Sequence, residues 1–199
     1  MNHSLTEEKL DSRELFHGKF LHAFSDQVRL PDGTLAQREY LVHPGAVMVI
    51  PLLPDGRVVL ERQYRYPVQQ AMIEFPAGKL DPGELPLDCA QRELHEETGY
   101  RAGEWARAGV LHPCISYSTE LIEIWFAREL QAGERQLDAG EFLDVETIDL
   151  EVLDEAVRRG DVTDAKTMIG LLWLQNWRAG RWPLEWRPAP AAPPAPTSR

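Results

Sequence analysis

The chain of 199 residues is poor in cysteine and in positive charge, and it has no long apolar run. Two cysteines cannot form a disulfide framework, so we expect a reducing, cytoplasmic location. The formal net charge of -11 argues against a nucleic-acid backbone or an anionic membrane as partner. No stretch reaches the length of a transmembrane helix, and the polar N-terminus is unlike a signal peptide. A phosphorylated small molecule stays possible as substrate, because bound cations can supply the positive field.

Alternation of apolar and polar residues, together with turn signals, predicts many short strands and three helices. The expected strands are 16–24, 27–30, 35–42, 45–53, 57–64, 72–75, 104–111, 121–127 and 142–148. The expected helices are 86–98, 150–159 and 163–177. Strands around a central helix, followed by two more helices, predict an α/β fold: an α/β/α sandwich over a mixed sheet. The first forty residues predict an extra antiparallel sheet.

The expected domain organisation follows these elements. Residues 1–12 form a flexible leader, 13–43 an N-terminal β subdomain, 44–184 the main domain, and 185–199 a Pro/Ala-rich disordered tail. The chain is long enough for one well-cored domain with an added subdomain.

The segment 78–100 carries the strongest chemical signal. Pro86 suits the first turn of a helix, and Gly99 supplies a C-terminal stop. Glu93, Glu96 and Glu97 recur at i, i+3 and i+4, so they share one helix face. Oxygen ligands grouped in this way suit a hard divalent cation such as Mg²⁺ or Mn²⁺.

A solvated acidic face is the alternative reading of these glutamates, and it is the commoner one for such runs. The preceding loop favours the metal site, because its glycines, its proline and Glu84 stand at fixed offsets from the helix. The segment has the spacing G-x5-E-x7-R-E-(apolar)-x-E-E-x-G-(apolar). Its residues are Gly78, Glu84, Arg92, Glu93, Glu96, Glu97 and Gly99.

This spacing resembles the signature of the Nudix hydrolases. The resemblance implies that Glu93 and Glu97 are the main metal ligands, that Glu96 is a more variable third ligand, and that the carbonyl of Ala77 is another. It also implies that Glu84 and Arg92 brace the site, Arg92 by pairing with a signature carboxylate.

Further segments are similar to the ADP-ribose pyrophosphatase branch of that family. They are Arg38-Glu39-Tyr40-Leu41-Val42-His43-Pro44-Gly45-Ala46-Val47, Glu61-Arg62-Gln63-Tyr64-Arg65-Tyr66 and Glu74-Phe75-Pro76-Ala77-Gly78. The resemblance implies Mg²⁺-dependent hydrolysis of ADP-ribose to AMP and ribose 5-phosphate. It also implies a homodimer whose N-terminal sheets are exchanged, so that the active sites are shared.

In that branch, the position of Arg65 contacts the phosphates, and Arg38 and Glu39 reach the nucleoside end from the partner subunit. A surface ion pair or a solvated strand end is an equally good reading of these three residues. Glu74, Ser116 and Glu120 are further candidates for substrate contacts.

The resemblance places the general base in a loop outside the signature, where Glu141 is the first candidate and Glu120 the second. The loop before Tyr117-Ser118-Thr119-Glu120 departs from the branch. Relatives usually carry Ser-Pro-Gly there, whereas this chain has Cys114-Ile115-Ser116. Substrate preference is therefore less constrained than the class of reaction.

Two other functions remain open at this point. A sugar-nucleotide pyrophosphatase acting on GDP-mannose would share the signature and the N-terminal sheet. A non-catalytic sensor of ADP-ribose belongs to another class, but such domains usually have a damaged signature and a fused DNA-binding domain. All the signature carboxylates are present here, which favours the enzyme.

Overall fold

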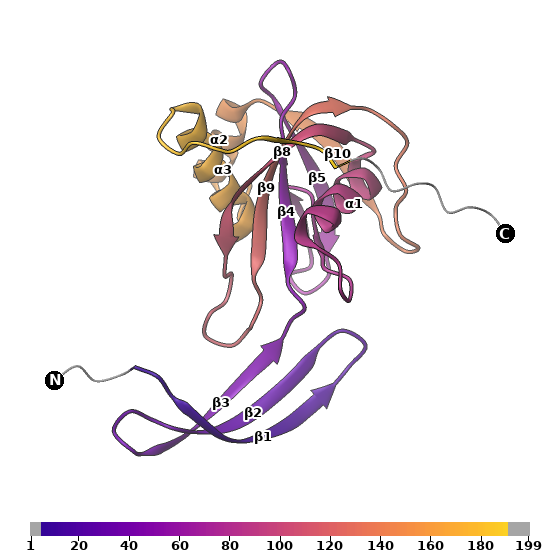
Figure 1. Cartoon of the computed structure of the whole chain (residues 1–199). Helices are drawn as coiled ribbons and strands as arrows, with labels where there is room; N and C mark the ends of the chain where they lie inside the picture. Colours follow the sequence, from indigo (N-terminus) through magenta and orange to yellow (C-terminus); the bar gives the residue numbers. More distant parts are fainter. Residues whose placement is uncertain (1–4, 191–199) are drawn as a thin grey trace.

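The computed structural model describes residues 5–190, which fold into three sheets and three helices (Figure 1). The strands are β1 (Glu8–His17), β2 (His22–Arg29), β3 (Leu35–Val42), β4 (Ala46–Pro51), β5 (Val58–Arg65), β6 (Gln70–Glu74), β7 (Ala77–Lys79), β8 (Arg101–Leu111), β9 (Ile122–Gln131), β10 (Leu143–Ile148) and β11 (Arg187–Pro188). The helices are α1 (Pro86–Thr98), α2 (Leu150–Arg159) and α3 (Ala165–Arg178). The predicted α/β class with a separate N-terminal antiparallel sheet is confirmed.

The N-terminal sheet has the order β1-β2-β3 and lies apart from the core at the bottom of Figure 1. Its first strand differs from the prediction. Residues 8–12 belong to β1, so the predicted leader 1–12 is wrong in its boundary, and residues 1–4 lie outside the described part. The predicted strands 16–24 and 27–30 are also wrong, because the chain turns at residues 18–21 and β2 then runs unbroken to Arg29.

The missed turn has a physical explanation. Phe20 and Leu21 are apolar and read as strand, although they lie in the turn. The turn is closed by a hydrogen bond from the N–H of Gly18 to the carbonyl of Leu21 at 2.8 Å. A Cβ at Gly18 would lie 2.7 Å from the ring of Phe16, so a larger residue would have to displace that ring.

The core is built on a five-stranded sheet with the order β11-β8-β9-β4-β7. Strand β4 pairs parallel with β9 and antiparallel with β7, so the sheet is mixed as predicted. Every residue of β4 is buried, as its apolar run predicts. Val47 and Val49 pack with α1 on one face, while Met48 and Ile50 belong to the larger core on the other.

That larger core also takes up the second sheet, β10-β5-β6, and the apolar faces of α2 and α3. Helices thus cover both faces of the mixed sheet, which is the predicted sandwich (Figure 1). In this arrangement β5, β6, β7 and α1 come together, and they carry the acidic residues of the candidate site.

The C-terminal segment also differs from the prediction. Residues 185–190 were expected in a disordered tail, but Arg187 pairs with Trp105 of β8. Trp186 packs against Phe126 and Trp177, and this aromatic contact holds the segment on the sheet. Residues 191–199 of the predicted tail lie outside the described part. Within residues 5–190, no helix is both long and apolar enough to cross a membrane.

Candidate active site

Helix α1 positions the acidic residues, and its ends form as the sequence predicts. Pro86 occupies the first turn, where backbone N–H groups have no partner within the helix, so its lack of an N–H costs no hydrogen bond. Gly99 ends the helix with φ 77°, a left-handed conformation, and its N–H donates to the carbonyl of His95 at 2.8 Å. Ala90 and Leu94 are buried against the sheet, which turns Glu93 and Glu97 toward the residues of β7.

Arg92 joins the loop and the helix through its guanidinium. Nε and Nη2 each donate to Glu84 at 2.8 Å, while Nη1 donates to Glu93 at 2.8 Å and to Glu96 at 3.0 Å. The hydrogen bonds from Arg92 lower the pKa of Glu84 to about 2. Arg92 therefore relieves the repulsion between glutamates one turn apart and fixes the orientation of two of them.

Gly78 is needed because the backbone of β7 passes very close to Glu93. A Cβ at position 78 would lie 1.8 Å from Oε1 of Glu93. No L-residue with a side chain fits there unless Glu93 moves, which explains a glycine at this place in the motif.

Glu97 is buried and lies against a second acidic residue, Glu61 of β5. Oε2 of Glu97 accepts a hydrogen bond from the N–H of Ala77 at 3.1 Å. Neither side-chain oxygen of Glu61 meets a donor among residues 5–190, so the two facing carboxyl groups can share only a proton or a cation.

The pKa shifts of these groups follow from their burial. Burial, and then the charge of Glu74, raise the pKa of Glu61 to about 7. Burial, and then the charge of Glu61, raise the pKa of Glu97 well above its usual value. Burial also raises the pKa of Glu93. Negative charge is thus costly at three neighbouring positions, and a bound cation would offset that cost.

Two cationic side chains lie close to these carboxylates. Arg65 donates to both oxygens of Glu74, with Nε at 2.5 Å and Nη2 at 2.8 Å. Lys166 of α3 also contacts Glu74 and reaches Asp164 at 3.0 Å. Glu74 is almost fully buried, and both its oxygens are engaged by the two cations. It therefore positions Arg65 and Lys166 and has little freedom to contact a ligand.

Apart from Glu61 and Glu84, these groups border one open cavity of about 900 Å³, a size that accommodates a nucleotide-sized ligand. Its acidic lining residues are Glu74, Asp81, Glu93, Glu96, Glu97, Glu120, Asp138, Glu141 and Asp164, and its basic ones are His43, Arg65, Lys79, Arg92 and Lys166. The cavity thus presents cation-binding oxygens and anion-binding nitrogens to the same space.

Comparison with known proteins agrees with this geometry. Residues 42–169 match the model of the NUDIX domain, a span that includes β4, α1 and the whole carboxylate cluster. The chain belongs to the Nudix family. Residues 7–41 match a second model, the nucleoside diphosphate sugar hydrolase N-terminal domain, which corresponds to the separate N-terminal sheet of this Nudix protein.

Two relatives align over most of this Nudix chain. An ADP-ribose pyrophosphatase from Bacillus subtilis (strain 168) is 36% identical over 174 residues, which cover 86% of this chain and 94% of that protein. A methanol dehydrogenase activator from Bacillus methanolicus is 36% identical over 176 residues, with the same coverage of 86% and 94%. A crystal structure of an ADP compounds hydrolase superposes with a TM-score of 0.80 at 24% identity, covering 89% of this chain and 97% of that one. That structure supports the Nudix fold.

The candidate bases lie at different places around the Nudix cavity. Glu141 accepts a hydrogen bond from Gln63 at 3.2 Å, and its charge contributes to the raised pKa of Glu93 and Glu97. Glu120 lies in the loop between β8 and β9, where its Oε1 is 3.8 Å from Nε2 of His43. Glu141 is therefore the candidate base whose negative charge acts on the carboxylates of α1.

The residues predicted to reach the nucleoside are not part of the Nudix cavity of their own chain. Arg38 lies on β3 and pairs with Glu7, with Nη2 to Oε1 at 2.7 Å, and Glu39 is exposed beside it. Ser116 is exposed in the altered loop, where its hydroxyl lies 3.8 Å from Sγ of Cys114. The structure of one chain thus leaves these three residues away from the site.

Three residues of the site escaped the sequence analysis: Glu61, Asp164 and Lys166. The segment that contains Glu61 was noted in the sequence, but no role was assigned to this residue. Its position could have indicated one, because it is a charged residue directly after the apolar Val58-Val59-Leu60. Lys166 and Asp164 begin α3, far along the chain, and Asp164 caps the helix by accepting from the N–H of Thr167 at 2.9 Å. Only the folded structure brings them to Glu74.

The carboxylate oxygens of the Nudix helix fit a hard divalent cation. The buried carboxyl pair of Glu61 and Glu97, which lacks enough donors for two negative charges, supports this fit directly. Glu93, Glu96 and Glu97 would hold the cation together with the carbonyl of Ala77, and all four residues border the cavity.

Proposed function

We propose that this Nudix enzyme hydrolyses the diphosphate bond of ADP-ribose, giving AMP and ribose 5-phosphate, with Mg²⁺ or Mn²⁺ as cofactor. The observation that carries the proposal is one cavity lined by the carboxylates of Glu93 and Glu97 and by the cations Arg65 and Lys166, with Glu61 buried against Glu97 behind it. The B. subtilis relative, an ADP-ribose pyrophosphatase, supports the choice of substrate.

Each wall of the cavity has a role in this proposal. Glu93 and Glu97, with Glu96 as a third ligand, bind the cations on one side. When bound, divalent cations neutralise the diphosphate oxygens and lower the pKa of a water molecule. Arg65 and Lys166 bind the phosphates on the other side, since each borders the cavity while Glu74 holds it in place.

Glu141 is the proposed general base. It lies in the loop before β10 and borders the cavity beside the carboxylates of α1. Its carboxylate accepts a proton from the attacking water, whose oxygen forms a bond to one phosphorus atom. The bond from that phosphorus to the bridging oxygen breaks, and the two monophosphates separate.

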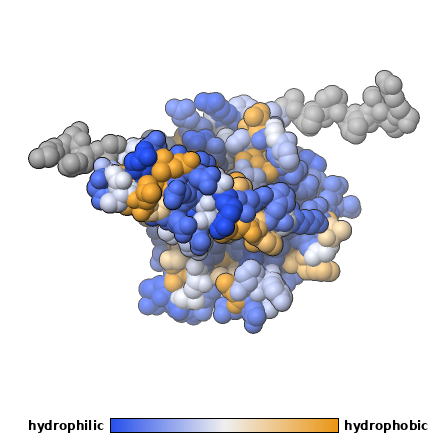
Figure 2. All heavy atoms as spheres, turned by 90° about the horizontal axis from the view of Figure 1, so that it is seen from below, coloured by the Kyte–Doolittle hydropathy of each residue, from blue (hydrophilic) through white to orange (hydrophobic). Residues whose placement is uncertain are grey.

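We further propose a homodimer in which the N-terminal sheet of one chain completes the site of the other. A three-stranded sheet without a covering helix leaves apolar side chains in water. Figure 2 shows hydrophobic patches among hydrophilic residues on the face of the molecule that includes this sheet. The exposed apolar residues of the sheet include Leu10, Leu15, Phe16, Leu35 and Val42. A partner would cover them and would give Arg38 and Glu39 a substrate to contact.

A product assay tests the proposed activity. The untagged full-length enzyme is incubated with Mg²⁺ and ADP-ribose, GDP-mannose or ATP, and the products are separated by chromatography. We expect AMP and ribose 5-phosphate from ADP-ribose and little turnover of the other two. A preference for GDP-mannose would keep the chemistry but change the substrate, and the altered loop at Cys114 would then be the first place to examine.

The sensor alternative is tested in the same assay. Binding of ADP-ribose without product, in a folded protein with Mg²⁺ and with Mn²⁺, would overturn the enzymatic proposal. Light scattering at several concentrations tests the homodimer, and a monomer at assay concentrations would overturn the shared site. The expected cytoplasmic location stays a prediction, to be checked by cell fractionation.

A further inference from the structure

A second group of metal-ligating side chains lies at the end of the β1–β2 hairpin, outside the cavity. His17 and His22 are the last cross-strand pair before the turn. Residues paired directly across two antiparallel strands project from the same face, with Cβ atoms about 5 Å apart. Their rings accordingly meet edge to face, with centroids 4.0 Å apart.

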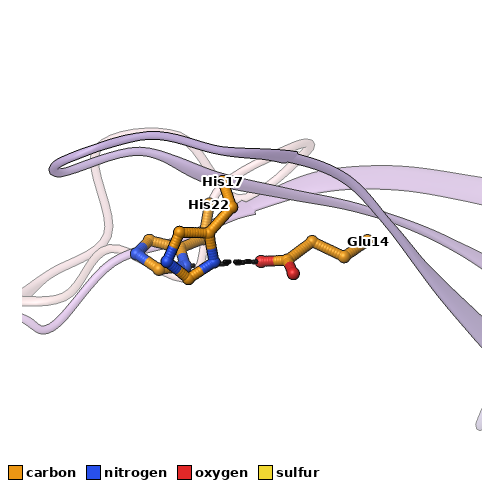
Figure 3. Close-up of side chains that lie close together, drawn as sticks. All are labelled: Glu14, His17 and His22. Atoms are coloured by element: carbon orange, nitrogen blue, oxygen red, sulfur yellow. Dashed lines mark hydrogen bonds and ion pairs between the residues drawn. The ribbon is translucent and has the colours of Figure 1, made fainter.

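A strand irregularity adds Glu14 to this face. In a regular strand residues 14 and 17 would point to opposite faces, because side chains alternate. Here Glu14 pairs with Phe24 and Phe16 pairs with Ala23, so one extra residue is accommodated on β1 between the two pairs. This bulge reverses the alternation and places Glu14 beside His17 (Figure 3).

The three side chains converge on one point. Oε1 of Glu14 lies 2.8 Å from Nδ1 of His17 and 3.4 Å from Nδ1 of His22. Within residues 5–190 this is the one group of three potential ligands whose ligand atoms all lie within 4.8 Å of one another. Ligands at tetrahedral corners around a metal bound at about 2.1 Å are about 3.4 Å apart. Small side-chain rotations therefore suffice to enclose an ion.

We propose that Glu14, His17 and His22 bind a Zn²⁺-class dication through one carboxylate oxygen and two imidazole Nδ1 atoms. Two imidazoles with one carboxylate suit Zn²⁺, Co²⁺ or Ni²⁺ and differ from the oxygen-only set of α1, which suits Mg²⁺. The exposed fractions of the three side chains are 40%, 65% and 34%, so an ion can enter from solution and keep a water molecule as fourth ligand.

The charge of Glu14 favours this assignment. Its hydrogen bond with His17, and then the weaker contact with His22, lower the pKa of Glu14 below its usual value. A glutamate carboxylate is ionised at neutral pH without this shift, and a dication would take the place of the proton shared between Glu14 and His17. The site depends on the hairpin alone and is independent of the proposed hydrolytic function.

The test is a titration with Co²⁺, a spectroscopic substitute for Zn²⁺, in saturating Mg²⁺ so that the oxygen ligands of α1 are occupied. The untagged full-length chain is used in a Cys114→Ser background, which removes a partly exposed thiol ligand. We expect one Co²⁺ with visible ligand-field absorption, displaced by one equivalent of Zn²⁺. His17→Gln and His22→Gln should each weaken Co²⁺ binding by at least about tenfold, since loss of an outer-shell partner alone costs about that much.

His112→Gln is the matched control, because it removes an exposed imidazole elsewhere and should leave Co²⁺ affinity unchanged. Long-range ¹H–¹⁵N spectra give an independent measurement, in which Zn²⁺ should shift the Nδ1 signals of His17 and His22. The proposal is overturned if wild type binds no Co²⁺ under these conditions, or if both hairpin variants bind as wild type does. Shifts confined to other histidines would also overturn it.

Discussion

The catalytic core and the N-terminal hairpin both place carboxylates next to possible cations, but in opposite environments. In the core, burial raises the pKa of Glu97 and Glu93, so their negative charge is costly. At the hairpin, Glu14 is exposed, and its hydrogen bond with His17 lowers its pKa. A buried cluster needs a cation to hold its charge, whereas an exposed one is stable by itself. Burial, more than the number of acidic groups, therefore distinguishes the two regions.

The largest expected effect comes from removing the buried charge at the centre of the core. Glu97→Gln should lower kcat by about 10³-fold, because a metal ligand supplies several kcal/mol of transition-state stabilisation. Steady-state kinetics with ADP-ribose and Mg²⁺ measure the change, and circular dichroism checks the fold. Glu96→Gln is the comparison, and it should cost less because Glu96 is more exposed and already paired with Arg92. Near-normal turnover of the Glu97 variant would refute the assignment of the metal site.

The next effect is on the free energy of unfolding of the metal-free protein and on its dependence on pH. The pKa of Glu61 is about 7 in the native state against 4.5 in the unfolded chain. Between these values the native state keeps a proton that the unfolded state has lost, so its stabilisation is complete below pH 4.5 and disappears as pH rises through 7. Glu61→Gln lacks this titration. Relative to wild type, it should therefore gain about 2–3 kcal/mol between pH 5 and pH 8.

Urea unfolding in a metal chelator at the two pH values measures this gain. Glu84→Gln sharpens the comparison, because Arg92 lowers the pKa of Glu84 to about 2. The stabilisation from Glu84 is present above pH 4.5 and is lost as pH falls toward 2, so that variant should lose stability at both test values. A Glu61 variant whose difference from wild type is the same at pH 5 and pH 8 would contradict the raised pKa.

The third effect separates the two candidate bases. Glu141→Gln should lower kcat by about 10²-fold with little change in KM, because a general base acts in the chemical step. Glu120→Gln, tested in parallel, should affect kcat less, since Glu120 lies beside His43 and away from α1. If the Glu120 variant shows the larger loss of kcat, the base is Glu120 and the loop of Glu141 has another role.

The smallest effect tests whether the N-terminal sheet takes part in the reaction. Arg38→Ala should raise KM by about tenfold with little change in kcat, as expected for loss of one charged substrate contact. Arg29→Ala is a matched control, because both arginines are 48% exposed and each pairs with a glutamate near the N-terminus. An equal rise in KM for both variants would mean that the sheet is merely weakened.

The parts of the structure that the sequence predicted depend on local signals. Helix α1 has Pro86 at its start and Gly99 at its end, so its bounds followed from residues adjacent in the chain. Strand β4 followed from an unbroken apolar run. The hairpin of β1 and β2 was missed because its turn contains Phe20 and Leu21, whose apolar character is typical of a strand.

The unpredicted parts of the site depend on contacts between distant segments. Glu61 meets Glu97 only because β5 and α1 pack on each other, and Lys166 meets Glu74 across 92 positions of sequence. The ordered segment at Trp186 likewise depends on aromatic partners elsewhere, whereas its neighbouring prolines indicated disorder. Spacing motifs could point to candidate ligands of a cation but not to the buried groups beside them.

Arg92 has a consequence for how the enzyme matures. One guanidinium already pairs with Glu84, Glu93 and Glu96 before any metal arrives. If a cation binds at Glu93 and Glu96, it exchanges one positive partner for another, so these two carboxylates need not be unopposed when the helix forms. We therefore expect the helix to form before a divalent cation binds. Metal supply would then matter more for how fast the enzyme works than for whether the helix forms.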